Sequence, residues 1–460
     1  MSNSLQHHGP TVTRKPRFFI GLVEVAGYYR GLKHGFEALG HHVTFVNLEN
    51  HRFAYGGDDA KTPWVQWIRK TQAKKGKFWR FLNQLGRMFL MLWAMQRHDA
   101  FIFASNTSFL ANQADLKWLK RFGKTIIFQY HGSDDRPPYL DGSAMAQDKH
   151  RTIQTCIEMT HRKKQTLQRV EQYADYLISI PPQGHLHERP FIQWLRLGLP
   201  IVPQMIHQHG PQKQNTHLNE ETENKAIVNI LHCPSHPQAK GSDIIRQVVR
   251  DLQTEGYPIH LTEIINQPNR VVCEALADCD IVIDQLYADY GMASFATEAA
   301  WFGKPVIVGG YPSTLWPSWL PQEALPPTVY IQPDELKTSL IRLIEAPEER
   351  QAIGKRLNEF VREQWSTYQV ASRYCQLVAG DVPEDWWVDP QSITYWQGCC
   401  LKEDTAKHLI KEMIEMGGIQ SLCVSDKPEL EQQLVNVAKT APSKTPQEYS
   451  SKTLSPLSQN

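Results

Sequence analysis

Apolar runs separated by longer amphipathic stretches organise the chain from residue 17 to residue 346. The first run, RFFIGLVE at 17–24, is apolar without interruption between its charged ends, as in a strand buried on both faces. An amphipathic stretch at 29–39 follows, Gly40 suits a helix C-cap, and a second apolar run occupies 42–48. This order predicts a strand–helix–strand unit with parallel strands.

The same alternation runs through both halves of the chain and is interrupted once. Residues 203–225 are polar and lack apolar periodicity, so they are predicted to be an interdomain linker. The pattern predicts an α/β fold with parallel sheets covered by helices on both faces. The expected strands are 99–104, 124–130 and 175–180 before the linker, then 226–232, 259–264, 280–285, 304–308 and 328–331; the expected helices are 115–121, 152–173, 243–252, 270–277, 294–302 and 334–345.

The C-terminal part of the chain follows a different pattern. Pro347 begins a further amphipathic helical stretch, and beyond it Trp386, Trp387 and Trp396 are expected to pack an extension onto the body. One helix is expected there, at 405–416. The predicted organisation is a flexible N-terminus (1–16), an N-terminal domain (17–202), a linker (203–225), a second domain (226–346), a closing helix (347–380), an extension (381–438) and a disordered tail (439–460).

Composition narrows the class of protein. The chain has 460 residues with 13 Trp, 16 Tyr and 17 Phe, which excludes disorder throughout, and its net charge of +1 argues against a bulk nucleic-acid partner. The eight cysteines form no C-x-x-C pair, as expected of reduced thiols in a cytosolic protein. The first sixteen residues contain no secretory apolar segment, and the longest apolar run is 88–95, far short of the ~20 residues of a spanning helix. We therefore expect a cytoplasmic protein, with at most peripheral contact with the inner face of the membrane.

The near-neutral charge conceals one basic segment. Between Asp59 and Asp99 there are nine Lys and Arg residues and no acid. Phe, Leu, Met and Trp residues recur there at helical spacing from Phe78 to Trp93. Such a helix can lie on an anionic membrane surface, which makes 61–97 a candidate docking segment. The alternative is that the helix packs on the N-terminal sheet and its charges are merely solvated.

Two motifs in the second half carry candidate chemistry. In HCPSHPQAKGSD (232–243), Lys240 and Gly241 follow a strand, and Ser242 or Asp243 is expected to cap the next helix. A lysine beside a helix N-terminus can face a diphosphate. Otherwise Lys240-Gly241 is an ordinary solvated loop.

The second motif spans 280–306. Gly291 is expected to open a helix whose first amides form an anion site, with Glu298 one turn further along, where a carboxylate can bridge two ribose hydroxyls. Both motifs lie at the carboxyl ends of strands, where open α/β sheets bind ligands. Glu298 could instead serve only the helix dipole, and Asp284 is either a site residue or a turn former. The expected anion-binding amides are those of Met292, Ala293 and Ser294.

Together the segments "PS…KGS", "DIVIDQ" and "YGMASFATEAAWFGKPV" resemble retaining glycosyltransferases of the GT-B fold, in the family-4-like group. The resemblance covers 226–378 and, more weakly, 17–202. It implies two Rossmann-like domains facing across a cleft, with a helical extension beyond them. It also implies transfer of a sugar, with retention, from a nucleotide-diphosphate sugar to a glycan, lipid-linked or other acceptor.

The resemblance assigns roles to individual residues. Lys240 and Gly241 would contact the diphosphate and Glu298 the ribose, with lysine and helix amides in place of a metal, so that no metal or other cofactor is expected. The loop YHGSDDR (130–136) resembles the acceptor-side loop of the family, which would place His131 at the reaction centre. Gly27 would let backbone approach the donor phosphate, and the backbone near Ile264 would contact the base.

Two departures from the family pattern keep alternatives open. Tyr290 stands where the family's E-x7-E pair has its first glutamate, and Ser235 and His236 occupy the region in which an arginine often precedes the lysine. The alternatives are a nucleotide-sugar epimerase on the same fold and a non-catalytic nucleotide-sugar-binding protein. His131 could also be purely structural, and Asp134, Asp135 and Arg136 are expected to form a loop-shaping ion pair rather than a catalytic group.

Overall fold

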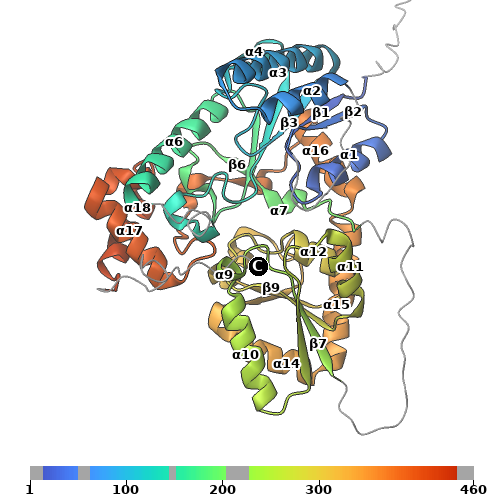
Figure 1. The fold of residues 1–460 in the computed structure, drawn as a ribbon, viewed down its shortest axis with the longest axis vertical. Helices are drawn as coiled ribbons and strands as arrows, with labels where there is room; N and C mark the ends of the chain where they lie inside the picture. Colours follow the sequence, from blue (N-terminus) through green and yellow to red (C-terminus); the bar gives the residue numbers. More distant parts are fainter. Residues whose placement is uncertain (1–13, 50–62, 144–151, 204–226, 443–460) are drawn as a thin grey trace, which may run out of the picture.

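The computed structural model describes residues 14–49, 63–143, 152–203 and 227–442, which form two Rossmann-like domains (Figure 1). Each domain is built on a parallel sheet, and residues from both domains line the cleft between them. This is the GT-B architecture that the sequence predicts. Most of the three segments predicted as a flexible N-terminus (1–16), a linker (203–225) and a disordered tail (439–460) lies outside the described residues.

The N-terminal sheet has seven strands in the order β12-β6-β5-β4-β3-β1-β2. All neighbours are parallel except β12, which runs antiparallel to β6. The five predicted strands are present, whereas β6 and β12 were not predicted because runs of three and two residues carry no periodicity. The bounds are β1 Phe18–Leu22, β2 Val43–Asn47, β3 Ala100–Ala104, β4 Thr125–Gln129, β5 Tyr176–Ser179, β6 Phe191–Gln193 and β12 Trp387–Val388.

Helices cover both faces of this sheet because successive strand residues alternate between two cores. Phe18 and Ile20 of β1 pack with the helices α1 and α16, while Phe19 points into the core beneath α2, α3, α4 and α6. The bounds are α1 Tyr28–Ala38, α2 Pro63–Gln72, α3 Lys77–Arg97, α4 Ala114–Arg121, α6 Ile153–Glu171 and α16 Thr367–Ala379.

The basic helix α3 packs on the sheet, but not through the apolar positions singled out in the sequence. Its buried residues are Asn83, Gly86, Leu90, Met91, Ala94 and Met95. Most of the large apolar residues expected to define its face are exposed or half-buried, including Phe78 and Phe81. The helix therefore has a second, outward apolar face.

The second domain has five parallel strands in the order β11-β10-β9-β7-β8. All of its predicted strands and helices are present with shifts of a few residues. The bounds are β7 Val228–His232, β8 Ile259–Glu263, β9 Ile281–Gln285, β10 Val306–Gly309, β11 Val329–Ile331, α9 Pro237–Lys240, α10 Ser242–Thr254, α11 Asn269–Asp278, α12 Ser294–Trp301, α13 Trp316–Trp319, α14 Leu336–Glu345 and α15 Pro347–Glu363.

The segment expected to be one closing helix consists of two, α15 and α16. Ser366 interrupts them, and its hydroxyl caps α16 by accepting a hydrogen bond from the amide of Gln369 at 3.3 Å. Helix α15 packs on α12 in the second domain, whereas α16 packs on α1 in the first. The chain therefore crosses back between the domains at this cap.

The extension returns to the N-terminal domain and also reaches the cleft. Its helices α17 (Glu403–Gly417) and α18 (Pro428–Lys439) pack beside α6, as Figure 1 shows. Between β12 and α17 the chain contacts both domains: the amide of Cys399 donates to the carbonyl of Leu140, and that of Cys400 to the carbonyl of Tyr287. Trp386 and Trp396 pack into the cores, while Trp387 stays 37% exposed.

Candidate functional site

Two adjoining cavities occupy the cleft. The first, of about 310 Å³, is lined mainly by the second domain, and we call it the C-domain cavity. The second, of about 260 Å³, lies between both domains and the extension, and we call it the interdomain cavity. Six residues line both cavities: Val25, Ser235, Lys240, Tyr290, Ala293 and Ser294.

Lys240 lies where the two cavities meet. It ends the one-turn helix α9, and Gly241, at φ +77°, turns the chain into α10. Gly241 itself is the N-cap of α10, so the expected capping role of Ser242 or Asp243 is wrong; the Ser242 hydroxyl lies 2.8 Å from His232 Nε2. Lys240 Nζ donates to the buried carboxylate of Asp284 at 3.1 Å. An ammonium has three donors, so two remain for a ligand.

The second anion-binding element begins at the predicted residue, but its free amides are not the expected ones. Helix α12 starts at Ser294, with Ala293 as N-cap, so its first free amides are those of Ser294 and the next two residues rather than those of 292–294. Ala293 and Ser294 line both cavities. Met292 is buried in the core, and Gly291, at φ +62°, packs beneath Trp316. Neither lines the cavities.

Glu298 and Ile264 line the C-domain cavity. The Glu298 side chain is buried, and its Oε1 accepts a hydrogen bond from Asn269 Nδ2 at 2.7 Å. Burial raises the pKa of Glu298 to about 7, while this hydrogen bond and the positive charge of Arg30, on the other domain, act in the opposite direction. The carboxyl group is therefore poised to change charge near neutral pH.

His131 lines the interdomain cavity, two residues after the end of β4. Its Nε2 is 2.9 Å from the hydroxyl of Tyr29, and the rings of Tyr28, Tyr29 and Trp194 meet it edge-on. Burial lowers the pKa of His131 to about 3, so the imidazole is neutral at physiological pH. A neutral imidazole offers one donor and one acceptor.

Gly27 occupies the predicted first strand–helix loop but does not line either cavity. It is the N-cap of α1 with φ +85°, and the preceding Val25 and Ala26 line the cleft. The buried carboxylate of Glu24 accepts the amides of Tyr29 and Arg30 at 3.2 and 3.0 Å. Because an acid already binds the first amides of α1, the N-terminus of this helix is a poorer phosphate site than that of α12.

Several residues that line the cleft escaped the sequence analysis. Arg136 forms a bidentate pair with Asp289 of the other domain, with Nε donating to Oδ2 at 2.6 Å, and both side chains are buried. Tyr290 accepts a hydrogen bond from Gln285 at the junction of the cavities. Cys399 and Cys400 of the extension line the interdomain cavity. No local sequence signal could reveal the Arg136–Asp289 pair or the place of Cys399 and Cys400, since these join segments far apart in the chain; Tyr290 lies within the 280–306 motif, but its contact with the cleft was not predicted.

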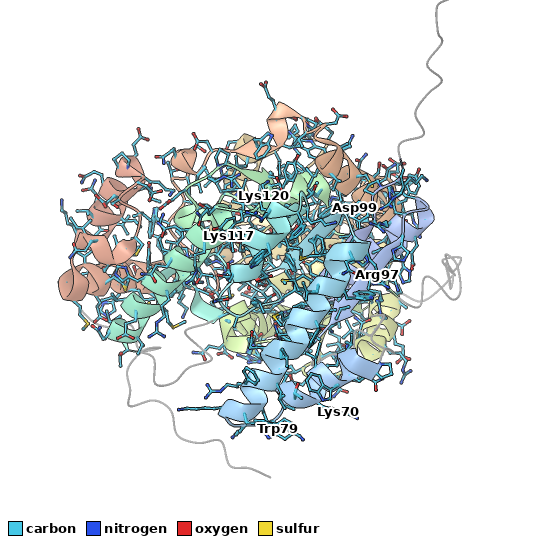
Figure 2. The ribbon with its side chains drawn as sticks, turned by 90° about the horizontal axis from the view of Figure 1, so that it is seen from above. Lys70, Trp79, Arg97, Asp99, Lys117 and Lys120 are labelled. Carbon is cyan, nitrogen blue, oxygen red and sulfur yellow. The ribbon has the colours of Figure 1, made fainter. Side chains whose placement is uncertain are left out.

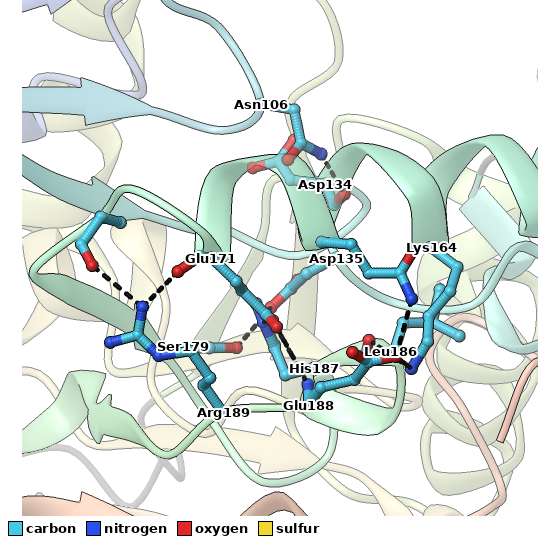
Figure 3. Close-up of polar contacts among 12 residues, drawn as sticks. Asn106, Asp134, Asp135, Lys164, Glu171, Ser179, Leu186, His187, Glu188 and Arg189 are labelled. Atoms are coloured by element: carbon cyan, nitrogen blue, oxygen red, sulfur yellow. Dashed lines mark hydrogen bonds and ion pairs between the residues drawn. The ribbon is translucent and has the colours of Figure 1, made fainter. Parts of the chain in front are cut away.

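The acids beside Arg136 have other partners, so the expected loop ion pair among them is wrong. Figure 3 shows His187 between Asp135, at 3.3 Å, and Glu171, at 2.8 Å. These acids raise the pKa of His187 to about 9 against the opposing effect of burial. Asp134 accepts the amide of His131 at 3.0 Å. Together with the bond from the Ser179 hydroxyl to Asp135, these contacts hold the His131 loop on β5 and α6. Arg136 is left to pair with Asp289 of the other domain and, at 3.8 Å, with Asp141 of its own.

Comparisons with known proteins add little beyond this geometry. No family model and no curated protein matches the sequence. Among solved structures, the chain is similar to Anabaena HepE in complex with UDP-glucose (11% identity, 79% of this chain and 99% of that one, TM-score 0.41). It is also similar to WaaG, a glycosyltransferase involved in lipopolysaccharide biosynthesis (12%, 79% and 99%, TM-score 0.38), and to a Neisseria meningitidis UDP-GlcNAc 2-epimerase bound to UDP-GlcNAc (10%, 79% and 100%, TM-score 0.36). At these values the superpositions carry no argument about function.

Across the described ranges, no three His, Cys, Asp or Glu residues are grouped as a metal site would require. Nor is any described helix both long and apolar enough to cross a membrane.

Proposed function

We propose that this protein transfers a sugar, with retention, from a nucleotide-diphosphate sugar to a glycan or lipid-linked acceptor. One observation carries the proposal: Lys240 lies at the junction of two cavities, with Glu298 in the first and His131 in the second. A nucleotide in the C-domain cavity and its sugar in the interdomain cavity would place the diphosphate beside Lys240. Such a transfer breaks the bond between the sugar and this diphosphate.

The residues of the C-domain cavity suit a nucleotide diphosphate. The free donors of Lys240 and the first amides of α12 would neutralise the leaving diphosphate as its charge develops. Glu298, when ionised, would accept hydrogen bonds from the ribose hydroxyls. The backbone around Ile264 would contact the base. Lysine and amides are the counter-charges we propose here, so catalysis should not require an added divalent ion.

The interdomain cavity favours a transferase over the epimerase alternative. An epimerase must remove a proton from a sugar carbon, which requires a base. The described residues that line this cavity include no Asp or Glu. Of its two histidines, His131 is too weak a base at a pKa of about 3, which leaves His236 as the histidine an epimerase would have to use. A neutral His131 instead suits hydrogen bonding to a sugar hydroxyl. Without a carboxylate nucleophile there, retention would follow from acceptor attack on the face that the diphosphate leaves.

The first test is binding. Titration calorimetry with UDP, GDP and ADP should detect one nucleotide that binds the wild type at micromolar affinity. We expect Lys240→Gln and Glu298→Gln each to weaken binding at least tenfold, since each removes a charge-assisted contact. Lys355→Gln, at an exposed lysine on α15, should leave it unchanged. If none of the nucleotides binds, the proposal fails.

The second test is turnover with the matching nucleotide sugars and a panel of glycan and lipid-linked acceptors. A transferase releases nucleotide only when an acceptor is present, and NMR of the product should show the donor's anomeric configuration. Interconversion of sugars without an acceptor would identify an epimerase. Binding without either reaction would favour the non-catalytic alternative. Treatment with EDTA should leave the rate unchanged.

A further inference from the structure

The outer surface of α3 and α4 combines exposed apolar side chains with basic ones. On α3, Phe78 is 65%, Phe81 64% and Phe89 57% exposed. On α4, Trp118 is 52% exposed, and Phe122, which caps the C-terminus of this helix, is 59% exposed. We call this the α3–α4 surface; among the side chains that the structure describes on α2 and α3, Trp67, Met88 and Leu92 are also large, apolar and exposed.

The apolar residues of α3 form one stripe. With the half-buried Leu85, the positions Phe78, Phe81, Leu85, Met88, Phe89 and Leu92 fall on one side of the helix over ~21 Å. The opposite side, with Leu90, Met91 and Ala94, is buried against the sheet. Figure 2 shows α3 and α4 side by side on the outside of the domain. The side chains of this stripe therefore do not pack α3 against the sheet.

The charge of this surface is almost wholly positive. Residues 60–133 contain thirteen Lys and Arg and only two acids, Asp99 and Asp115. Asp99 pairs with Arg14 and Arg17, and the buried Asp115 accepts the Ser108 hydroxyl and the amide of Phe109. Lys120 pairs with Asp175, which lies beyond this segment. The exposed basic residues on α2, on α3, on the turn between them and on α4 are Lys70, Lys74, Lys75, Lys77, Arg80, Arg97, Lys117, Lys120 and Arg121.

We propose that the α3–α4 surface docks the protein on an anionic lipid bilayer, with the apolar stripe in the headgroup region and the lysines at the phosphates. Charge complementarity selects this occupant. A second copy would bring two basic surfaces together, which repel. Nucleic acid would use the lysines but would leave Met88 and Leu92 exposed, because bases stack on aromatic rings. Apolar insertion and anionic attraction together match the whole surface.

The inference does not depend on the proposed function, since the surface lies on the outer helices and none of its residues lines the two cavities. Either can fail without the other.

Vesicle flotation of the full chain tests the inference. We expect binding to vesicles of 70% phosphatidylcholine and 30% phosphatidylglycerol in 50 mM NaCl, little binding to pure phosphatidylcholine, and a marked loss in 500 mM NaCl. Replacing Lys74, Lys75 and Lys77 with Gln should weaken binding about 100-fold, at about fivefold per charge. Replacing Phe78, Phe81 and Phe89 with Ser should weaken it at least tenfold.

Matched controls change the same residue types elsewhere. Met416→Ser with Ile419→Ser alters apolar residues that are 58% and 40% exposed, and Lys355→Gln with Lys411→Gln with Lys439→Gln removes three charges. Both control sets should bind as the wild type does. The inference is overturned if the wild type does not float with anionic vesicles, if the controls lose as much binding, if RNA binds through these lysines more tightly than the vesicles do, or if sedimentation shows a dimer that the phenylalanine changes dissolve.

Discussion

The charge states in the cleft depend on burial more than on residue type. Glu298 and His131 are both enclosed, and burial moves their pKa values in opposite directions, to about 7 and about 3. The acid therefore becomes titratable near neutral pH, while the imidazole loses its usual capacity to titrate there. Lys240 keeps a partner in Asp284, which holds its ammonium group in place before a ligand arrives.

Glu298 predicts a specific pH dependence of nucleotide binding. Ribose hydroxyls donate to the ionised carboxylate, so affinity should be fully present above pH 7 and fall as the pH drops through 7, by up to tenfold per unit. Titration calorimetry from pH 5.5 to 8.5 measures this on the wild type. Glu298→Gln should bind more weakly at high pH and lose this part of the pH dependence. Parallel curves for the two proteins would contradict the role of the carboxylate.

Helix α1 shows how closely the elements of the N-terminal domain approach one another. It lies between the sheet and α16, and two glycines one turn apart face its neighbours. A Cβ on Gly31 would lie 1.7 Å from the carbonyl oxygen of Pro200, and one on Gly35 would lie 1.9 Å from that of Thr367. The absence of side chains there allows α16 to return to this domain.

We expect Gly35→Ala to destabilise the protein by about 2 kcal/mol, because the backbone of α16 must move away. This is opposite to the gain of about 1 kcal/mol that alanine brings to an unencumbered helix interior. Urea unfolding followed by circular dichroism measures the difference. Glu37→Ala, at a half-exposed position of the same helix, should change stability by less than about 0.5 kcal/mol. A Gly35→Ala protein as stable as the wild type would show that α1 and α16 are not in this contact.

At the scale of the whole molecule, the domains are joined by buried polar contacts as well as by the crossing chain. Arg136 of one domain pairs with Asp289 of the other, and Gln183 donates to the same carboxylate at 3.2 Å. The extension adds the backbone bonds of Cys399 and Cys400 to opposite sides of the cleft. These contacts fix the shape of the interdomain cavity.

Asp289→Asn should destabilise the protein by about 3 kcal/mol, because it leaves the buried guanidinium without its main counter-charge. Hydrogen exchange should also quicken at residues 395–403, which bridge the domains beside this pair. Asp243→Asn is the control, since Asp243 pairs with Arg246 while 84% exposed and should cost less than about 0.5 kcal/mol. Equal effects of the two changes on urea unfolding would refute the structural importance of the Arg136–Asp289 pair.

The local sequence pattern was enough to predict most helices and strands, but not the contacts that form the cleft. Long apolar runs such as that around β1 predicted the strands, because a strand buried on both faces needs every residue to be apolar. The helix was predicted at 294–302, where α12 begins, but its anion-binding amides were placed at 292–294 because Gly291 looks like a helix opener, although it serves a turn against Trp316. The partner of Arg136 could not be inferred, since the acids beside it in sequence turn toward His187 and His131.

The sequence by itself therefore determined the two-domain α/β fold, which follows from periodicity, and brought Lys240 and Glu298 forward from residue types at strand ends. His131 came forward only through the resemblance of its loop to a known family. Only the tertiary structure decided which residues meet. It placed Lys240 between two cavities, brought Cys399 and Cys400 of the extension into the cleft, and turned the phenylalanines of α3 outward. Such contacts join residues up to hundreds of positions apart, and the local pattern carries no information about them.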